Sequence, residues 1–445
     1  MIIRFSVTNF RSIYEEQTLD FEATASNNKS DNLVEQGDLR LLKSVVIYGA
    51  NASGKSNLLR AFNSLRAFIV NSIDLKKGDR ISERFYDPFL LKKGSSEEPT
   101  KFKVEFIGYD ERRYIYETHF DRVKVIYECL IVYETSQPST LFLRENSNEF
   151  VKLYDKFVDK SVDVSVLSNN LFLSKVGNSP NEQIGNIYLY FKDIEIWNFA
   201  NTSRVMDLYF RVRDIFENEN NSIFARKLSK LINISDTKIE SIFVEKIDIE
   251  VPKLEGMPEA EFESLRSKYV ERFSSQTYGV HIVYDNEDMQ TGTTNLEFVR
   301  RQSAGTISAF AIGGLFLHTL LKERPGLIIL DEFDNSLHPD LCKFLIEIFH
   351  NPLVNSNGSQ LAFVTHETQL LDRDLFRRDQ IWLAEKNDLG RSEFFSVIDF
   401  KDGREGMSFD KWYNLGKFGG VPHIRKTEFF ADYEQDATEI QRVKA

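Results

Sequence analysis

Residues 45–56 read VVIYGANASGKS, and this stretch decides the fold. Its first four residues are apolar and end abruptly at Gly49, which predicts a buried strand. A helix is expected to begin after Gly54. The residues from Gly49 to Ser56 fit the pattern G-x-x-x-x-G-K-[ST], and a loop of this pattern between a strand and a helix is typical of a phosphate-binding site.

The residue types in this loop suit phosphate chemistry. Glycine lets backbone N–H groups turn toward phosphate oxygens, and the N-terminus of the following helix adds a positive dipole. Lys55 is expected to reach the terminal phosphates, and the Ser56 hydroxyl is expected to bind Mg²⁺. A glycine-rich turn that binds nothing is the alternative. The predicted nucleotide-binding residues of this stretch are Gly49, Asn51, Ala52, Ser53, Gly54, Lys55, Ser56 and Asn57.

A second apolar strand ends in adjacent carboxylates. Residues 327–332 read LIILDE, and a buried strand of this kind delivers charge to the edge of a parallel sheet. Asp331 is predicted to hold Mg²⁺ through water, and Glu332 is predicted to polarise the attacking water as general base. Phosphoryl transfer needs both charge neutralisation and an oriented nucleophile. A strand followed by these two residues is common, so this prediction depends on the phosphate loop upstream.

A third apolar strand ends in a histidine. Residues 361–366 read LAFVTH, and we predict that His366 touches the γ-phosphate, although a lone histidine is more often structural. Residues 301–306 read RQSAGT and precede an apolar helix, so Ser303 lies near the N-cap with Gly305 beside it. Free N–H groups there would suit a second phosphate contact, but a plain N-cap fits equally well.

Composition and charge narrow the class of protein. The chain has 445 residues, of which 42% are hydrophobic and 28% charged, as in an ordinary globular protein of two or three domains. The net charge of −12 opposes a protein that coats nucleic acid through overall positive charge. Cys129 and Cys342 are too few for a disulfide framework or a four-ligand zinc site, which indicates a reducing compartment.

We expect a cytoplasmic protein that does not bind membranes. The apolar stretch 307–321 is interrupted by His318 and is shorter than the roughly 20 residues that cross a bilayer. The first residues alternate like a strand and lack the apolar core of a secretory signal.

Hydrophobic periodicity predicts an α/β protein in three parts. Alternating residues between 101 and 133 indicate an antiparallel meander, whereas apolar residues between 205 and 232 recur at helical spacing. After residue 303, helices and strands alternate, which implies a mostly parallel sheet with covering helices. The expected elements there are a helix at 307–321, a strand at 327–330, a helix at 339–349 and strands at 360–364 and 380–384. The predicted parts are 1–180, a helical insertion at 181–276, and 277–445.

Together, these motifs resemble those of the ATP-binding-cassette (ABC) ATPases, in the branch that includes SMC-like and RecF-like heads and the OLD-type ATPases. In this resemblance, residues 49–56 are the Walker A loop, 303–305 a shortened signature, 327–332 Walker B, 333–338 the D-loop and His366 the switch histidine. Residues 9–12, NFRS, also resemble these heads, which implies that Arg11 lies near the nucleotide phosphates. No glutamine between Ser56 and Lys101 marks a Q-loop.

The resemblance implies an ABC-ATPase head, which is a P-loop NTPase with a mostly parallel sheet, an antiparallel β subdomain and an inserted helical lobe. It implies ATP and Mg²⁺ as cofactors and ATP hydrolysis, which we expect to be slow. In this branch the signature of one subunit caps the nucleotide of the other. Ser303 and Gly305 are therefore expected to act in trans, in a homodimer or a higher oligomer.

A narrower resemblance covers nearly the full length. Residues 9–12, 87–89, 334–339 and the late stretch 413–422, YNLGKFGGVP, resemble compact phage-defence ATPases of the RloA, AbiL and PARIS kinds. This implies a sensor or switch of an abortive-infection system that controls a separately encoded toxin or nuclease, with a phage protein or nucleic acid as its trigger. The alternatives are a DNA-repair or chromosome-maintenance ATPase that binds DNA directly, and an assembly scaffold with negligible turnover.

Overall fold

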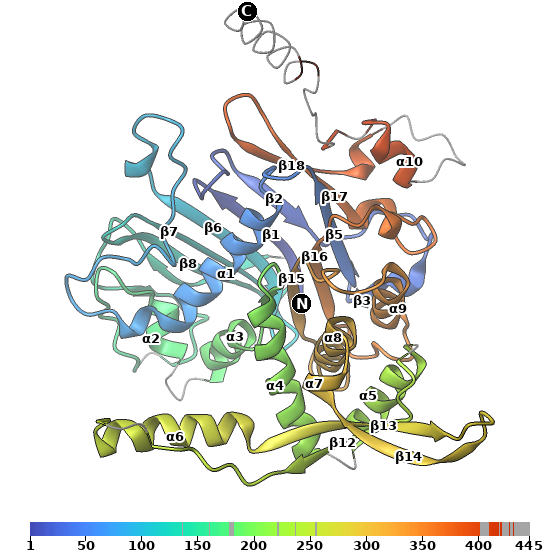
Figure 1. Ribbon diagram of the computed structural model, residues 1–445. Helices are drawn as coiled ribbons and strands as arrows, with labels where there is room; N and C mark the ends of the chain where they lie inside the picture. The colour runs from blue at the N-terminus through green and yellow to red at the C-terminus, as the bar shows by residue number, and fades with distance from the viewer. Residues whose placement is uncertain are drawn as a thin grey trace, which may run out of the picture.

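The computed structural model describes most of the chain. The described ranges are residues 1–135, 137–159, 161–177, 182–219, 222–235, 237–253, 256–400, 409–417 and 419–420, with Thr427 and Phe430. Figure 1 shows two sheets in the body of the molecule and a third sheet that lies along one side of it.

A six-stranded sheet forms the centre of the fold, in the order β11-β15-β16-β5-β17-β18. Every residue of β5, β15 and β16 is buried, as expected for strands covered on both faces. The first five strands are parallel, and β18 runs antiparallel to β17. The strands are β5 Ser44–Gly49, β11 Glu195–Asn198, β15 Leu327–Asp331, β16 Gln360–Val364, β17 Ile381–Lys386 and β18 Ser392–Ser396.

Two hydrophobic cores lie on opposite faces of this sheet. Val45 and Ile47 of β5 join one core, and the alternate residues Val46 and Tyr48 join the other. The first core contains α1 Lys55–Asn71, and the second contains α8 Ala304–Leu320 and α9 Pro339–His350. The predicted α/β class is confirmed, and the helices and strands expected after residue 303 are present with ends shifted by a few residues.

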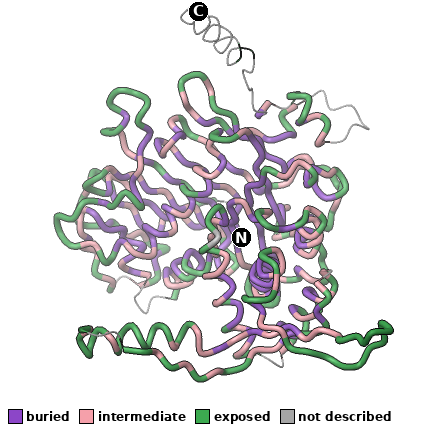
Figure 2. Tube along the Cα trace, in the orientation of Figure 1, coloured by how far each residue is buried: buried purple, intermediate pink, exposed green. Residues whose placement is uncertain are grey.

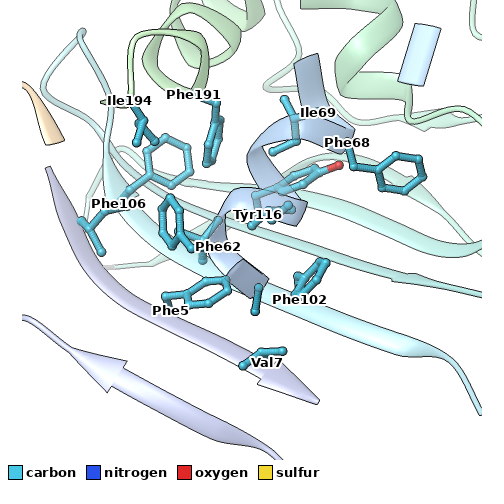
Figure 3. Close-up of a cluster of buried hydrophobic side chains, with 14 of the residues drawn as sticks. Phe5, Val7, Phe62, Phe68, Ile69, Phe102, Phe106, Tyr116, Phe191 and Ile194 are labelled. Atoms are coloured by element: carbon cyan, nitrogen blue, oxygen red, sulfur yellow. The ribbon is translucent and has the colours of Figure 1, made fainter. Parts of the chain in front are cut away.

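A seven-stranded antiparallel sheet closes the first core. Its order is β10-β9-β8-β7-β6-β1-β2, so the expected meander is longer than predicted and also takes in the N-terminal strand. Figure 3 shows aromatic side chains of this sheet against α1, and the rings of Phe5 and Phe62 lie 4.8 Å apart. The strands are β1 Ile2–Thr8, β2 Gln17–Asp20, β6 Thr100–Ile107, β7 Arg113–Phe120, β8 Val125–Tyr133, β9 Pro138–Arg144 and β10 Lys152–Leu153.

The segment predicted as a helical insertion is neither purely helical nor separate. It contains the expected helices, but β11 pairs with β15 in the central sheet, and β12 Ser241–Lys246 pairs with β13 Ser275–Tyr284. The predicted boundary at residue 276 therefore falls inside a strand, and residue 181 lies outside the described residues. Sequence patterns did not predict the short strands of this segment, because the helical spacing of apolar residues between 205 and 232 dominates its hydrophobic pattern. The helices are α3 Glu182–Lys192, α4 Thr202–Asn218, α5 Ile223–Ile234 and α6 Glu259–Phe273.

The third sheet lies along the side of the body that carries α4 and α5. It has the order β12-β13-β14, with β14 at Gln290–Glu297. α6 buries none of its residues, and Figure 2 shows this helix and the β13–β14 hairpin as largely exposed. The remaining elements include β3 Leu33–Gln36, β4 Leu39–Leu42, α2 Phe172–Gly177, α7 Phe298–Arg301, the 3-10 helix η4 Thr368–Leu370 and α10 Phe409–Asn414. Within the described ranges, no helix is long and apolar enough to span a membrane.

Gly314 of α8 tests the packing of the second core. A Cβ at Gly314 would lie 2.2 Å from Val212 Cγ1 of α4, and the β-branched valine has little rotamer freedom in a helix. We expect Gly314→Ala to lower the stability by about 1–3 kcal/mol despite its better helix propensity. The matched control is Gly185→Ala in α3, where a Cβ meets open space, and we expect a gain of up to about 1 kcal/mol. Thermal unfolding midpoints that rise equally in both variants would contradict this packing.

Candidate nucleotide-binding site

Glycine is required at both ends of the phosphate loop. A Cβ at Gly49 would lie 2.3 Å from the carbonyl oxygen of Ala384 in β17. A Cβ at Gly54 would lie 2.0 Å from Ser392 Oγ, and Gly54 has a φ of +103°, which L-residues rarely adopt. The loop therefore passes so close to β17 and β18 that side chains are excluded, and α1 begins at the next residue.

Two serines outside the loop hold it in place. Ser392 Oγ donates to the carbonyl oxygen of Ser53 at 2.6 Å, and Ser392 N donates to Ser12 O at 2.7 Å. Ser12 Oγ in turn accepts from Asn57 Nδ2 at 2.7 Å. Sequence reasoning missed Ser392, because a serine after the turn at Gly390 carries no motif. The loop is thus supported by β18 and by the segment that follows β1.

Lys55 is folded back onto its own loop. Its Nζ donates to Gly49 O at 2.7 Å and to Ala50 O at 3.0 Å. Burial lowers the pKa of Lys55 to about 8, and the nearby carboxylates Asp331 and Glu332 oppose this shift. The amine is therefore a buried donor held by two carbonyl oxygens. Phosphate oxygens would be stronger acceptors for it, because charge-assisted hydrogen bonds to anions exceed those to carbonyls.

Both carboxylate oxygens of Asp331 accept hydrogen bonds from neighbouring side chains. Ser56 Oγ donates to Asp331 Oδ1 at 2.9 Å, and Asn198 Nδ2 donates to Asp331 Oδ2 at 2.6 Å. Burial raises the pKa of Asp331, since the charged form loses its water. The amide oxygen of Asn198 accepts from Ala200 N at 3.0 Å, so Asn198 positions Asp331 through its amide nitrogen. The Ser56 hydroxyl and the Asp331 carboxylate are oxygen ligands of the kind that Mg²⁺ prefers, so these two residues fit the ion. Asn198 was missed because it ends a short strand, β11, that carries no motif.

Glu332 holds a left-handed backbone conformation. Its φ is +57°, and its N–H donates to Val364 O at 3.1 Å. Such a conformation costs about 1–3 kcal/mol for a residue with a side chain and persists where the surroundings impose it, often at functional sites. The turn at Glu332 follows β15 directly, and the Glu332 side chain is partly exposed. It is close enough to Lys55 for its charge to raise the lysine pKa.

His366 faces Glu332 from the neighbouring strand end. His366 Nε2 lies 4.0 Å from Glu332 Oε1, and both side chains are partly exposed. Burial lowers the pKa of His366, and the positive charge of Lys55 lowers it further, whereas Glu332 and Asp334 raise it. The imidazole is therefore favoured in its neutral form near neutral pH.

The structure thus gathers most of the predicted site residues at one edge of the central sheet. Lys55 and Ser56 contact the loop carbonyls and Asp331 directly, and Glu332 and His366 face one another. Within the loop, Ala52 has a φ of +64° and Ser53 is buried, whereas Asn51 is exposed.

Arg11 and the two signature residues, Ser303 and Gly305, contact residues outside the phosphate loop. Arg11 Nε lies 2.8 Å from Asp87 Oδ2, which joins two of the stretches that the sequence singles out. Ser303 caps α8, with its Oγ accepting from Thr306 N at 3.1 Å, and Gly305 lies where a Cβ would be 2.9 Å from Ser336 O of the D-loop. A role in nucleotide binding stays a prediction for these three residues, and for Ser303 and Gly305 it concerns a second subunit.

The pH dependence of nucleotide binding tests the buried lysine. The pKa of Lys55 is about 8 without ligand, and bound phosphates would raise it, so binding above this pH requires uptake of a proton. We expect MgATP affinity to be constant below about pH 7 and to fall by about tenfold per pH unit above pH 8. Lys55→Arg should bind less tightly and without this dependence, since arginine stays charged.

Calorimetric titration from about pH 7 to about pH 9.5 measures this dependence, with Lys55→Ala as the variant expected to lose binding. An affinity that stays constant over this range would contradict the protonation linkage. Parent-like affinity in Lys55→Ala would contradict the loop as the binding site.

Comparison with solved structures finds low overall similarity. An SMC head domain from Thermotoga maritima has a TM-score of 0.39 at 11% identity, over 89% of this chain and 98% of that one. The recombination mediator RecF with ATPrS has a TM-score of 0.37 at 13% identity, over 89% and 98% of the two chains. The same mediator with ATP has a TM-score of 0.35 at 12% identity, over 88% and 97%. No curated protein matches the sequence.

A family model does match the sequence itself. It covers residues 44–372, which is more than half of the chain and extends from β5 to beyond His366. The matched region thus contains the phosphate loop, both carboxylates and the histidine. The chain therefore belongs to the family of AAA domains described as putative AbiEii toxin, type IV toxin–antitoxin system.

Proposed function

We propose that this chain binds and hydrolyses ATP and that it acts as the switch of an anti-phage, abortive-infection system. One observation carries the proposal. Ser56 Oγ of the phosphate loop donates to Asp331 at 2.9 Å, and Glu332 and His366 lie 4.0 Å apart beside them. A phosphate cradle, a metal-binding carboxylate and a candidate base in one place are the parts that phosphoryl transfer to water needs.

Binding uses the loop and its lysine. The backbone N–H groups at the start of α1 and the Lys55 ammonium would hold the phosphates, and the lysine would leave Gly49 O and Ala50 O to do so. Ser56 and Asp331 are the residues that would hold Mg²⁺, and Asn198 would orient the Asp331 carboxylate through its amide nitrogen. The ion would neutralise the charge that develops on the phosphate oxygens.

Hydrolysis would use the two side chains that face each other. Glu332 would accept a hydrogen bond from the attacking water and orient it, which its position directly after β15 and 4.0 Å from His366 supports. His366, favoured as neutral imidazole, is placed to donate a hydrogen bond to the γ-phosphate. We expect slow turnover, as befits a switch whose two states must persist.

Control of a separately encoded toxin or nuclease is the second part of the proposal. The family's description refers to a toxin–antitoxin system, which supports a role in growth control. Residues 372–374 read DRD, and a nuclease fused to this chain could use such a pair of carboxylates. Asp372, however, lies 3.2 Å from Lys343 Nζ and accepts from Asp374 N. In the described residues, no group of three or more His, Cys, Asp or Glu side chains forms a further metal site. We further propose that the chain acts as a homodimer or a higher oligomer, with Ser303 and Gly305 completing the partner's site.

Three other functions differ from this one in testable ways. The family's description names a toxin, which favours a chain that is itself the toxin, and this is the second candidate. A DNA-repair or chromosome-maintenance ATPase would bind duplex DNA directly, but the net charge of −12 opposes this. A scaffold that binds ATP without turnover would retain the phosphate loop and not need Glu332.

Glu332→Gln tests the assigned base. The variant should keep MgATP binding, because the amide preserves the shape of the side chain, and should slow hydrolysis by a factor on the order of 100 or more. The matched control is Glu347→Gln, an exposed carboxylate on α9, which should hydrolyse ATP at the parent rate. Phosphate release under single-turnover conditions is the measurement. Equal rates in the parent and Glu332→Gln would move the base elsewhere, with His366 as the next candidate.

Expression in a bacterial host, with and without the product of the neighbouring gene, tests the biological role. We expect the chain alone to be harmless and unprotective, and the pair to stop growth on phage infection. When the Glu332→Gln chain is expressed with the same partner, growth after phage infection should differ from that of the parent pair. The reason is that a chain that hydrolyses ATP more slowly would stay in its ATP-bound state. Growth arrest by the chain alone would favour the toxin, and strong protection by the chain alone would contradict control of a partner.

A further inference from the structure

Two residues of the described C-terminal segment, Tyr413 and Gly420, pack against the start of the phosphate loop. Tyr413 of α10 is buried, and its hydroxyl donates to Gly420 O at 3.0 Å. Gly420 has a φ of +70°, and a Cβ there would lie 3.5 Å from both Gly49 Cα and Ala384 O. Gly420 N donates to Glu385 Oε1 at 3.4 Å. Figure 1 shows α10 beside β17, so this C-terminal segment covers the strand end from which the loop begins.

Gly49 is held from two directions. Burial raises the pKa of Tyr413, and a hydrogen bond from the Gly49 backbone N–H to its hydroxyl lowers it. On the other side, Gly49 O accepts from Lys55 Nζ at 2.7 Å. The lysine bond must break when Lys55 turns to a phosphate, whereas the Tyr413 hydroxyl is also bonded to Gly420 O, outside the phosphate loop. Tyr413 therefore supports the loop independently of Lys55.

Tyr48 connects the same segment to the histidine loop. The rings of Tyr48 and Tyr413 lie 6.0 Å apart, and both belong to the second core. The Tyr48 hydroxyl donates to Glu367 O at 3.4 Å, and Glu367 follows His366 directly. α10 also packs against η4, the 3-10 helix after Glu367. Contacts from one C-terminal segment thus reach both the binding loop and the loop of the hydrolysis residues.

We propose that Tyr413 is a positioning residue, which aligns the phosphate loop for nucleotide and couples it through Tyr48 to the His366 loop. The described residues 409–417, 419 and 420 are then the route by which contacts on α10 alter the nucleotide state. The inference rests on the proposed ATPase function and adds a regulatory element to it. It also gives a role to the part of the late motif YNLGKFGGVP that the structure describes, since residues 418, 421 and 422 lie outside the described residues.

Removal of one hydroxyl tests the positioning role. Tyr413→Phe keeps the ring and its packing but loses the bonds to Gly49 and Gly420, and we expect the Kd for MgATP to rise about fivefold. Tyr188→Phe in α3 is the matched control. Tyr188 is also buried, and its hydroxyl donates to the backbone carbonyl Val70 O at 3.2 Å. The control should lose similar thermal stability and no MgATP affinity. An unchanged Kd in Tyr413→Phe would overturn the positioning role.

A double-mutant cycle tests the coupling. Tyr48→Phe removes the bond to Glu367 O, and we expect its loss to appear in kcat rather than in Kd. If the two tyrosines act as one unit, Tyr48→Phe/Tyr413→Phe should lose less kcat/KM than the product of the single losses, by at least about a factor of two. Losses that multiply would overturn the coupling. A parent protein that does not bind MgATP would instead overturn the proposed function itself, and the two failures are therefore distinguishable.

Discussion

The parallel register of three strands is the constraint on which the candidate site depends. In the order β15-β16-β5, Asp331 pairs with Val364, and Val364 pairs with Ile47, so β15 and β16 end in one row and β5 ends two residues further on, at Gly49. Glu332, the Thr365–His366 turn and the phosphate loop come at these neighbouring strand ends. Each strand is an apolar run buried on both faces. A shift of one residue in its pairing register would move each side chain from one hydrophobic core to the other. The chemistry of the site is therefore set by the packing of the sheet.

Support for the phosphate loop comes from both ends of the chain. Ser12 follows the first strand, Ser392 lies in β18, and Tyr413 lies in α10, yet all three contact the loop or hold its neighbours. A loop that must exclude side chains at Gly49 and Gly54 gains little from its own packing, so it needs external hydrogen bonds to keep one conformation. This arrangement makes the loop conformation depend on segments far away in the sequence.

Sequence patterns predicted the parts of the site that follow apolar strands. Lys55, Ser56, Asp331, Glu332 and His366 lie in motifs whose context is readable, and the structure brings them together. Asn198 and Ser392 were missed because single polar residues on short strands have no pattern, and their role arises only from strand pairing. The segment predicted as a helical insertion also contains strands, and β11 within it pairs with β15 of the central sheet. Arg11 illustrates a further limit, since its partner Asp87 is distant in sequence.

The central claim is that nucleotide phosphates replace the loop carbonyls as the partners of Lys55. A structure of the chain with Mg²⁺ and a non-hydrolysable ATP analogue tests this most directly. The account predicts phosphates within residues 49–56, with Lys55 Nζ on them and away from Gly49 O, and Mg²⁺ bound by Ser56 with Asp331 beside it. An analogue bound elsewhere, or a Lys55 that still donates to Gly49 O while the analogue is bound, would contradict it.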